Sequence, residues 1–247
     1  MKHGINRAGV ALGVLVMAAC SDASGPESPS EALLTRDVAM VAADAVLEDL
    51  VDMSQLMLGA GLPAPPEDGS GSVTRTVTYF DAAGIEQTSH DPETTASIHM
   101  VMDGTREISR DSWTASGTRH RDLMITGLAG EETSRTVNGT GSGTLTRSSH
   151  TDDDGGRTYD MSTTSVIENV VHPVPRTDES WPLSGTITRE ISVTITDGPD
   201  GDVTRNRTVV VTFDGTQWAV MAVVGGETFE VDLSTRSGRH PFRKRGQ

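Results

Sequence analysis

The pattern of apolar and polar residues changes once along the chain, from a helical period to a period of two. Between residues 31 and 59, apolar side chains recur every three or four positions, which is the spacing of one face of a helix. From Val73 onward, apolar and polar side chains alternate, which is the spacing of a strand with one buried face. We therefore expect one amphipathic helix followed by an antiparallel sheet.

The predicted helix spans residues 31–59. Ser30 suits its N-cap, and Gly59, Gly61 and Pro63 end it. Its apolar face consists of Leu34, Val38, Val41, Ala42, Ala45, Val46, Leu50, Met53 and Met57. Asp49 and Asp52 stand at the edge of this face. A face this wide needs a partner surface, so we expect a helix that packs in the core.

The alternation is clearest in residues 73–80, 186–196 and 203–213. One buried face should combine Ile187, Ile191, Val193 and Ile195 with Val209, Val211 and Phe213. Trp218 should lie in or beside that core, with Val220 on its face and Ala219 opposite. We expect Trp113 and Trp181 to be core anchors as well.

Glycine-rich segments that suit tight turns interrupt the strands. They are residues 80–84, 102–105, 137–140, 152–156, 197–202, 213–216 and 224–227. The segment NGTGSGT (138–144) has the composition of a flexible hairpin. These turns predict ten to twelve strands between residues 73 and 233, with one long connection, and the best internal boundary, at 172–182.

The predicted fold is mainly β (α+β). It is a large curved antiparallel β-meander, or an incomplete barrel, packed against one long N-terminal amphipathic helix. This architecture is broadly similar to that of periplasmic lipoprotein carriers and lipoprotein-docking proteins, whose half-barrel is closed by helices. By regions, we expect a helix at 31–59, a linker at 60–72, a β domain at 73–235 and a basic tail at 236–247.

The first twenty residues have the pattern of an export signal. Lys2 and Arg7 precede an apolar stretch at 8–17, and small residues follow it. The segment Met17-Ala18-Ala19-Cys20 resembles the lipobox of bacterial lipoproteins. That resemblance implies removal of a signal peptide, residues 1–19, and lipidation of Cys20. The competing interpretation is a soluble secreted protein cut after Ala23.

Residues 20–30 would then form the lipidated cysteine and a flexible Pro/Ser tether. By the same resemblance, Ser21 rather than Asp after the cysteine implies sorting to the outer membrane, at its periplasmic face. The whole chain has 20 basic and 35 acidic residues, and residues 1–19 contain two of the basic ones, so 18 − 35 gives a mature net charge of −17. Such a charge disfavours nucleic acid as a partner, and the membrane would be reached through the lipid anchor.

The sequence contains no recognised catalytic motif. Lys2 and Lys244 are its only lysines and Cys20 its only cysteine, which excludes a P-loop and cysteine-based zinc or redox sites. Two acidic turns are weak candidates for a cation: Asp152 and Asp154 beside His150, and Asp197, Asp200 and Asp202. We expect no cofactor.

The sequence therefore predicts an envelope lipoprotein with a non-enzymatic structural or binding role. One alternative is a carrier or sensor of an amphipathic, lipid-like ligand held between the sheet and the helix. Another is a hydrolase with an unrecognised site. For the basic tail, a solvated end competes with a contact to phosphate-rich envelope polymers or to the acidic face of the protein itself.

Overall fold

The computed structural model describes residues 71–109, 113–149, 158–175, 177, 180–197, 201–234 and 242–244. It also describes a set of helical positions near the N-terminus: Thr35, Val38, Ala39, Ala42, Ala43, Ala45, Val46, Leu47, Asp49, Leu50 and Met53. The predicted signal peptide, Cys20 and the tether lie outside the described residues. So do the two ends of the predicted helix.

The described strands form a single antiparallel sheet, in the order β11-β10-β9-β8-β7-β6-β5-β4-β3-β1-β2. Their bounds are β1 Val73–Asp81, β2 Glu86–Gln87, β3 Thr95–Ser109, β4 Trp113–Thr126, β5 Ser134–Ser149, β6 Thr158–Pro173, β7 Ser184–Thr196, β8 Val203–Thr212, β9 Trp218–Val223, β10 Thr228–Asp232 and β11 Phe242–Lys244. From β3 to β11, neighbours in sequence are neighbours in space. The predicted meander is confirmed, as is the predicted number of strands between residues 73 and 233.

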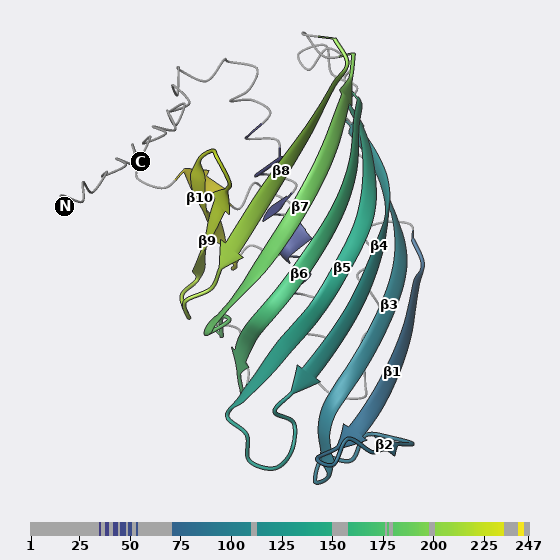
Figure 1. The fold of residues 1–247 in the computed structure, drawn as a ribbon, viewed down its shortest axis with the longest axis vertical. Helices are drawn as coiled ribbons and strands as arrows, with labels where there is room; N and C mark the ends of the chain where they lie inside the picture. The colour runs from purple at the N-terminus through teal and green to yellow at the C-terminus, as the bar shows by residue number, and fades with distance from the viewer. Residues whose placement is uncertain are drawn as a thin grey trace, which may run out of the picture.

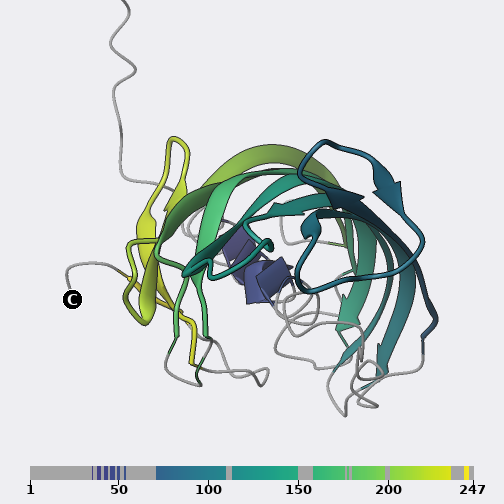
Figure 2. The same cartoon turned by 90° about the horizontal axis from the view of Figure 1, so that it is seen from below.

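The sheet is strongly curved and open. Figure 1 shows its long, tilted strands, and Figure 2 shows the sheet arched over the helical residues. Its two ends, β11 and β2, do not pair with each other. The mainly β, incomplete-barrel prediction is therefore confirmed, whereas a continuous helix over 31–59 stays a prediction.

The core lies between the concave side of the sheet and the helical positions. Val38, Ala42, Val46 and Met53 are almost fully buried. On the sheet, alternate residues of each strand face them, among them Ile98, Met100, Leu123, Ile125, Val137, Ile167, Ile187, Ile191, Val209, Val211, Met221 and Phe229. The shared face predicted for 186–196 and 203–213 is confirmed, because Val193 pairs with Arg205 and Ile187 with Val211 on one side.

Two predicted turns are wrong. Residues 102–105 lie inside β3, and the segment 138–144, expected to be a flexible hairpin, lies inside β5. Both segments pair with strands on either side. In β5 the glycines serve close approach between strands: a Cβ built on Gly143 would lie 2.5 Å from the carbonyl oxygen of Thr118. Glycine is needed there because the curved strands leave no room for a side chain.

Three further expectations are corrected at the C-terminal half. In β9, Ala219 faces the core, whereas Trp218 and Val220 are half-buried on the other side. Residues 242–244 of the predicted basic tail, for which a solvated end was one alternative, form β11, which pairs with β10. The connection around 172–182 does not separate two sheets, because β6 pairs with β7 across it. Trp181 packs against the core, as predicted.

Candidate functional site

The concave face carries the arginines of strands β1, β3, β4, β5, β7 and β8. Each of them occupies a position with the same alternation as the buried residues: Arg75, Arg106, Arg119, Arg121, Arg135, Arg147, Arg189, Arg205 and Arg207. The acids of β3–β8 occupy the opposite, outer face: Asp103, Glu107, Asp122, Asp160, Glu168 and Glu190. Across β3–β8 the sheet thus separates its basic and acidic side chains between its two faces.

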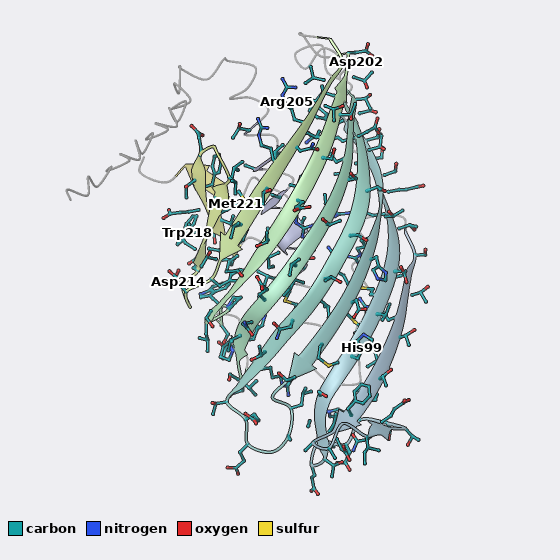
Figure 3. All side chains as sticks on the ribbon, in the orientation of Figure 1. His99, Asp202, Arg205, Asp214, Trp218 and Met221 are labelled. Carbon is teal, nitrogen blue, oxygen red and sulfur yellow. The ribbon has the colours of Figure 1, made fainter. Side chains whose placement is uncertain are left out.

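The concave arginines gather towards one end of the strands. Figure 3 places Asp202 and Arg205 at that end and Asp214 at the other end of β8. All but Arg135 lie on the Asp202 side, which we call the arginine half of the concave face. The rest of this face is the apolar half, whose cross-strand rows include Met100, Leu123, Ile167, Ile187, Val211 and Met221.

A buried ion cluster lies where these two halves meet. Asp49, at 1% exposure, contacts both Arg121 of β4 and Arg189 of β7. The Nε of Arg121 donates to Oδ1 of Asp49 at 2.6 Å, and Nη2 of Arg189 donates to Oδ2 at 2.5 Å. Each guanidinium therefore holds one oxygen of a single carboxylate, which is a strong charge-assisted arrangement.

Groups of the sheet also accept hydrogen bonds from the two arginines. Nη1 of Arg121 donates to the carbonyl oxygen of His120 at 2.8 Å, and Nη1 of Arg189 donates to Oγ1 of Thr163 at 3.3 Å. Burial lowers the pKa of Arg189, and Arg121 acts in the same direction, whereas Asp49 opposes the shift. The cluster brings two cations and one anion out of water, so its geometry matters to stability.

Two buried polar atoms beside the cluster have no hydrogen-bond partner among the described residues. They are Oγ of Ser165 and Nε of Arg189. Gly141 lies next to them: a Cβ there would be 2.7 Å from Oγ of Ser165 and 2.9 Å from Nη1 of Arg121. A side chain at this position would collide with both atoms, so only glycine fits where the serine and the arginine meet.

The outer face has a second candidate, a shallow polar trough across β1 and β3–β6. Its lining is rich in hydroxyl groups: Ser72, Thr74, Asp103, Gly104, Thr105, Thr118, Arg119, His120, Ser142, Gly143, Thr144, Ser162, Thr163 and Thr164. Nδ1 of His120 lies 2.8 Å from Oδ1 of Asp103, and Ser142 is the next residue across the sheet.

This row of acid, imidazole and hydroxyl does not form a nucleophilic triad. No hydrogen bond joins Ser142 to His120 in the described part of the chain, and both residues lie in strands paired on either side. An oxyanion site needs backbone N–H groups that are free to donate, and a fully paired sheet does not supply them. His99 makes a similar exposed pair with Asp122, at 2.8 Å. Both are cross-strand histidine–aspartate hydrogen bonds.

Of the predicted cation ligands, the structure describes Asp197 and Asp202. The backbone N–H of Asp197 donates to Oδ1 of Asp202 at 3.1 Å, which closes the turn between β7 and β8. Asp152, Asp154 and Asp200 lie outside the described residues. The described residues contain no group of three or more histidines, cysteines or acids that could hold a metal ion.

Sequence reasoning missed the ion cluster, although part of its signal was present. Arg189 stands between Ile187 and Ile191 with the same alternation, which already places it on the apolar face. Asp49 likewise stands at the edge of the helix stripe. Nothing in the local sequence pattern, however, indicates that Asp49, Arg121 and Arg189 come into contact.

No protein-family model, curated protein or solved structure matches this chain. Its function is therefore inferred from its own residues. The described residues include no helix that is long and apolar enough to cross a membrane.

Proposed function

We propose that this chain is a lipoprotein of the bacterial cell envelope with a non-enzymatic, structural or binding role. The single observation that supports this role is the filling of the concave face by the helical positions. Thr35, the first described helical residue, follows Cys20 by 15 residues and is itself buried. An acyl anchor on Cys20 would thus be joined through a short tether to an element of the core, at the periplasmic face of the outer membrane.

The finer features of this proposal are a continuous amphipathic helix over 31–59 and cleavage before Cys20. The lipobox-like segment and the helical period of the sequence support them. Acyl chains hold a protein at a bilayer because each buried methylene contributes about 0.8 kcal/mol. An acidic chain needs such an anchor, since its charge disfavours contact with anionic headgroups.

The test is the partition of the exported protein between detergent and aqueous phases. The wild type should enter the detergent phase, and mass spectrometry should find an acylated cysteine at its N-terminus. Cys20→Ser should move the protein to the aqueous phase, whereas Ser21→Ala, which keeps the cysteine, should leave it with the detergent. A wild-type protein that stays in the aqueous phase with Ser24 at its N-terminus would contradict the proposal in favour of a soluble secreted protein.

A second candidate function is a carrier or sensor of an amphipathic ligand between the sheet and the helix. The division of the concave face into an apolar half and an arginine half favours it, because an amphiphile has the same division. The packed helical positions favour the structural role.

A further inference from the structure

Strand β8 is longer than its neighbour β9, so part of one edge of β8 has no described strand beside it. β7 pairs with the whole of β8, whereas β9 pairs with it only from Val209 to Thr212. The N–H group of Val224 extends this contact to the carbonyl oxygen of Thr208. Residues 203–207 are therefore the open edge of β8, and Figure 1 shows this stretch continuing past the ends of β9 and β10.

Two exposed residues of the open edge direct their backbone groups away from β7. Backbone hydrogen bonds alternate between the two sides of an antiparallel strand, and Thr208 bonds on the β9 side. Its even-numbered neighbours, Thr204 and Asn206, therefore face that side as well. Their carbonyl oxygens accept hydrogen bonds from Nη1 of Arg205, at 3.2 Å, and from Nη1 of Arg207, at 3.1 Å. Their N–H groups donate to no described residue, so two donors are available to a further strand.

Such an edge is a template for one more strand, because its backbone groups repeat at the spacing of a sheet. A carbonyl oxygen has two lone pairs, so those of Thr204 and Asn206 can accept a further N–H group while the arginines stay bound. An antiparallel strand here would exchange two backbone hydrogen bonds with each of these residues. The open edge is five residues long, about 17 Å, so the added segment is short and extended.

The side chains of the open edge define what such a strand should carry. Val203, Arg205 and Arg207 lie on the concave side, and Thr204 and Asn206 lie on the outer side. Opposite charges that face each other across two strands stabilise the pair, and like charges destabilise it. From its N-terminus, an antiparallel strand should therefore have acids opposite the two arginines and an apolar residue opposite the valine. Polar residues would stand between them, on the outer side.

A second copy of this chain fits the open edge poorly. The pairing that joins Thr204 of one copy to Asn206 of the other sets the two Arg205 side chains directly opposite each other. The like charges make this pairing unfavourable. The charge of the edge therefore selects a different, acidic strand.

We infer that the open edge of β8 binds an extended acidic segment of a partner protein by strand addition, with the side-chain order acid, polar, acid, polar, apolar. This inference names the kind of partner for the binding role proposed above and rests on that role. The backbone groups of Thr204 and Asn206 supply the affinity, and Arg205 and Arg207 supply the preference for acids. The two acids match the arginines in spacing, since both pairs are two strand residues apart.

The probe is the fluorescently labelled peptide acetyl-Glu-Thr-Glu-Thr-Val-amide, titrated with the wild-type protein in nonionic detergent and followed by fluorescence anisotropy. N-methylation of its two threonines removes the N–H groups that would donate to Asn206 and Thr204, and should weaken binding at least about tenfold. N-methylation of the second glutamate and the valine, whose N–H groups would point away from β8, should leave the affinity unchanged. A peptide with lysines in place of both glutamates should bind about tenfold more weakly. Equal binding of all these peptides, or no binding of the first, overturns the inference.

A substitution on the edge tests the same bonds from the side of the protein. Asn206→Pro removes an N–H group that does not pair with β7, so the sheet should tolerate it, as sheets tolerate proline at open edges. Peptide binding should fall at least about tenfold. Asn206→Ala keeps the N–H group and should bind the peptide as the wild type does. If Asn206→Pro, folded, binds the peptide as tightly as Asn206→Ala, the inference is wrong.

Amide hydrogen exchange of the wild type needs no variant and decides where Asn206→Pro fails to fold. Bound peptide should slow exchange at Thr204 and Asn206 far more than at Arg205 and Arg207, whose N–H groups already donate to β7. Equal slowing at all four amides overturns the inference. Slow exchange at Thr204 and Asn206 before any peptide is added does so too, because the chain itself would then occupy the edge.

These results are independent of the membrane anchor. Detergent partition with no peptide binding leaves the proposed lipoprotein and removes this partner. Peptide binding by a wild-type protein without acyl chains does the reverse.

Discussion

Asp49 and Arg189 are 140 residues apart in the chain, and their side chains are joined by a hydrogen bond of 2.5 Å in the centre of the core. Arg121 binds the other oxygen of the same carboxylate. Three distant segments are therefore fixed to one another by one acid. A shift of the helical residues along the sheet would separate the buried carboxylate of Asp49 from its guanidinium partners. This cluster therefore sets the position of the helical residues along the sheet.

Removal of Asp49 should be one of the most destabilising single changes in the protein. Asp49→Ala leaves two buried guanidiniums without their anion and should cost about 3–5 kcal/mol in the free energy of unfolding. Urea denaturation measures this cost. Asp122→Ala, which removes an outer-face acid paired with His99, should cost less than about 1 kcal/mol. Similar costs for the two substitutions would contradict the role of the cluster.

Apolar side chains should be able to replace all three members of this cluster together without loss of stability. Asp49→Leu together with Arg121→Met and Arg189→Met exchanges a buried ionic group for apolar side chains. Such exchanges are often neutral or stabilising by about 1–4 kcal/mol. The triple variant should therefore unfold at a higher urea concentration than Asp49→Ala. A triple variant as unstable as the single one would show that the cluster fixes the fold in a way apolar packing cannot replace.

Burial of the helical positions can be tested with two identical substitutions. Val46 is 1% exposed against the sheet, whereas Val166 is 46% exposed on the outer face of β6. Val46→Asp should cost several kcal/mol, because it buries a carboxylate among apolar side chains. Val166→Asp should change stability by about 0.5 kcal/mol or less. The difference between their thermal midpoints is the measurement, and equal midpoints would place the helical residues outside the core.

The glycines of β5 should resist even the smallest side chain. A Cβ at Gly143 would lie 2.5 Å from the carbonyl oxygen of Thr118, so Gly143→Ala should force the strands apart at a cost of about 1–3 kcal/mol. At Gly226 the nearest atom is 3.5 Å from the added Cβ, and Gly226→Ala should be neutral or slightly stabilising. Chemical denaturation of the two variants tests the pair. Equal effects would mean that β4 and β5 are not so closely spaced.

The turn before β3 should weaken in acid. The pKa of Asp91 is lowered, first by the backbone N–H of Glu93, which donates to its carboxylate at 2.9 Å, and then by Thr94. Because the folded state lowers this pKa, the contribution to stability is present above the ordinary value of 3.8 and is lost as pH falls through the lowered one. NMR titration of the Asp91 carboxyl should show the low midpoint. The Thr94→Val variant should raise it, and an unchanged midpoint there would exclude the threonine as a cause.

Much of the sheet could be predicted from local pattern. Alternation of apolar and polar residues located β1, β7 and β8, because each side chain of a strand faces the side opposite to its neighbour. The turns at 197–202, 213–216 and 224–227 followed from residues that accept positive φ, as Gly201, Gly215 and Gly225 do. Short turns between such strands leave a meander as the simplest arrangement.

Local pattern failed where one residue type serves two purposes. Glycine at 139–143 was interpreted as a hairpin because glycine suits turns, yet in β5 it allows two curved strands to approach. β9 shows the same limit: in Trp218-Ala219-Val220 the larger side chains predicted the core side, whereas the pairing of β9 with its neighbours puts Ala219 there instead. Size alone does not determine which face of a short strand is buried.

By itself, therefore, the sequence determined the elements and most of the buried faces, since both depend on neighbours a few residues away. The tertiary structure alone decided the chemistry of the concave face. Arg121 and Arg189 could be placed on that face from their alternation, but their anion comes from Asp49, 72 and 140 residues away. A charge pattern states which residues require partners, and only the folded chain brings those partners within hydrogen-bond distance.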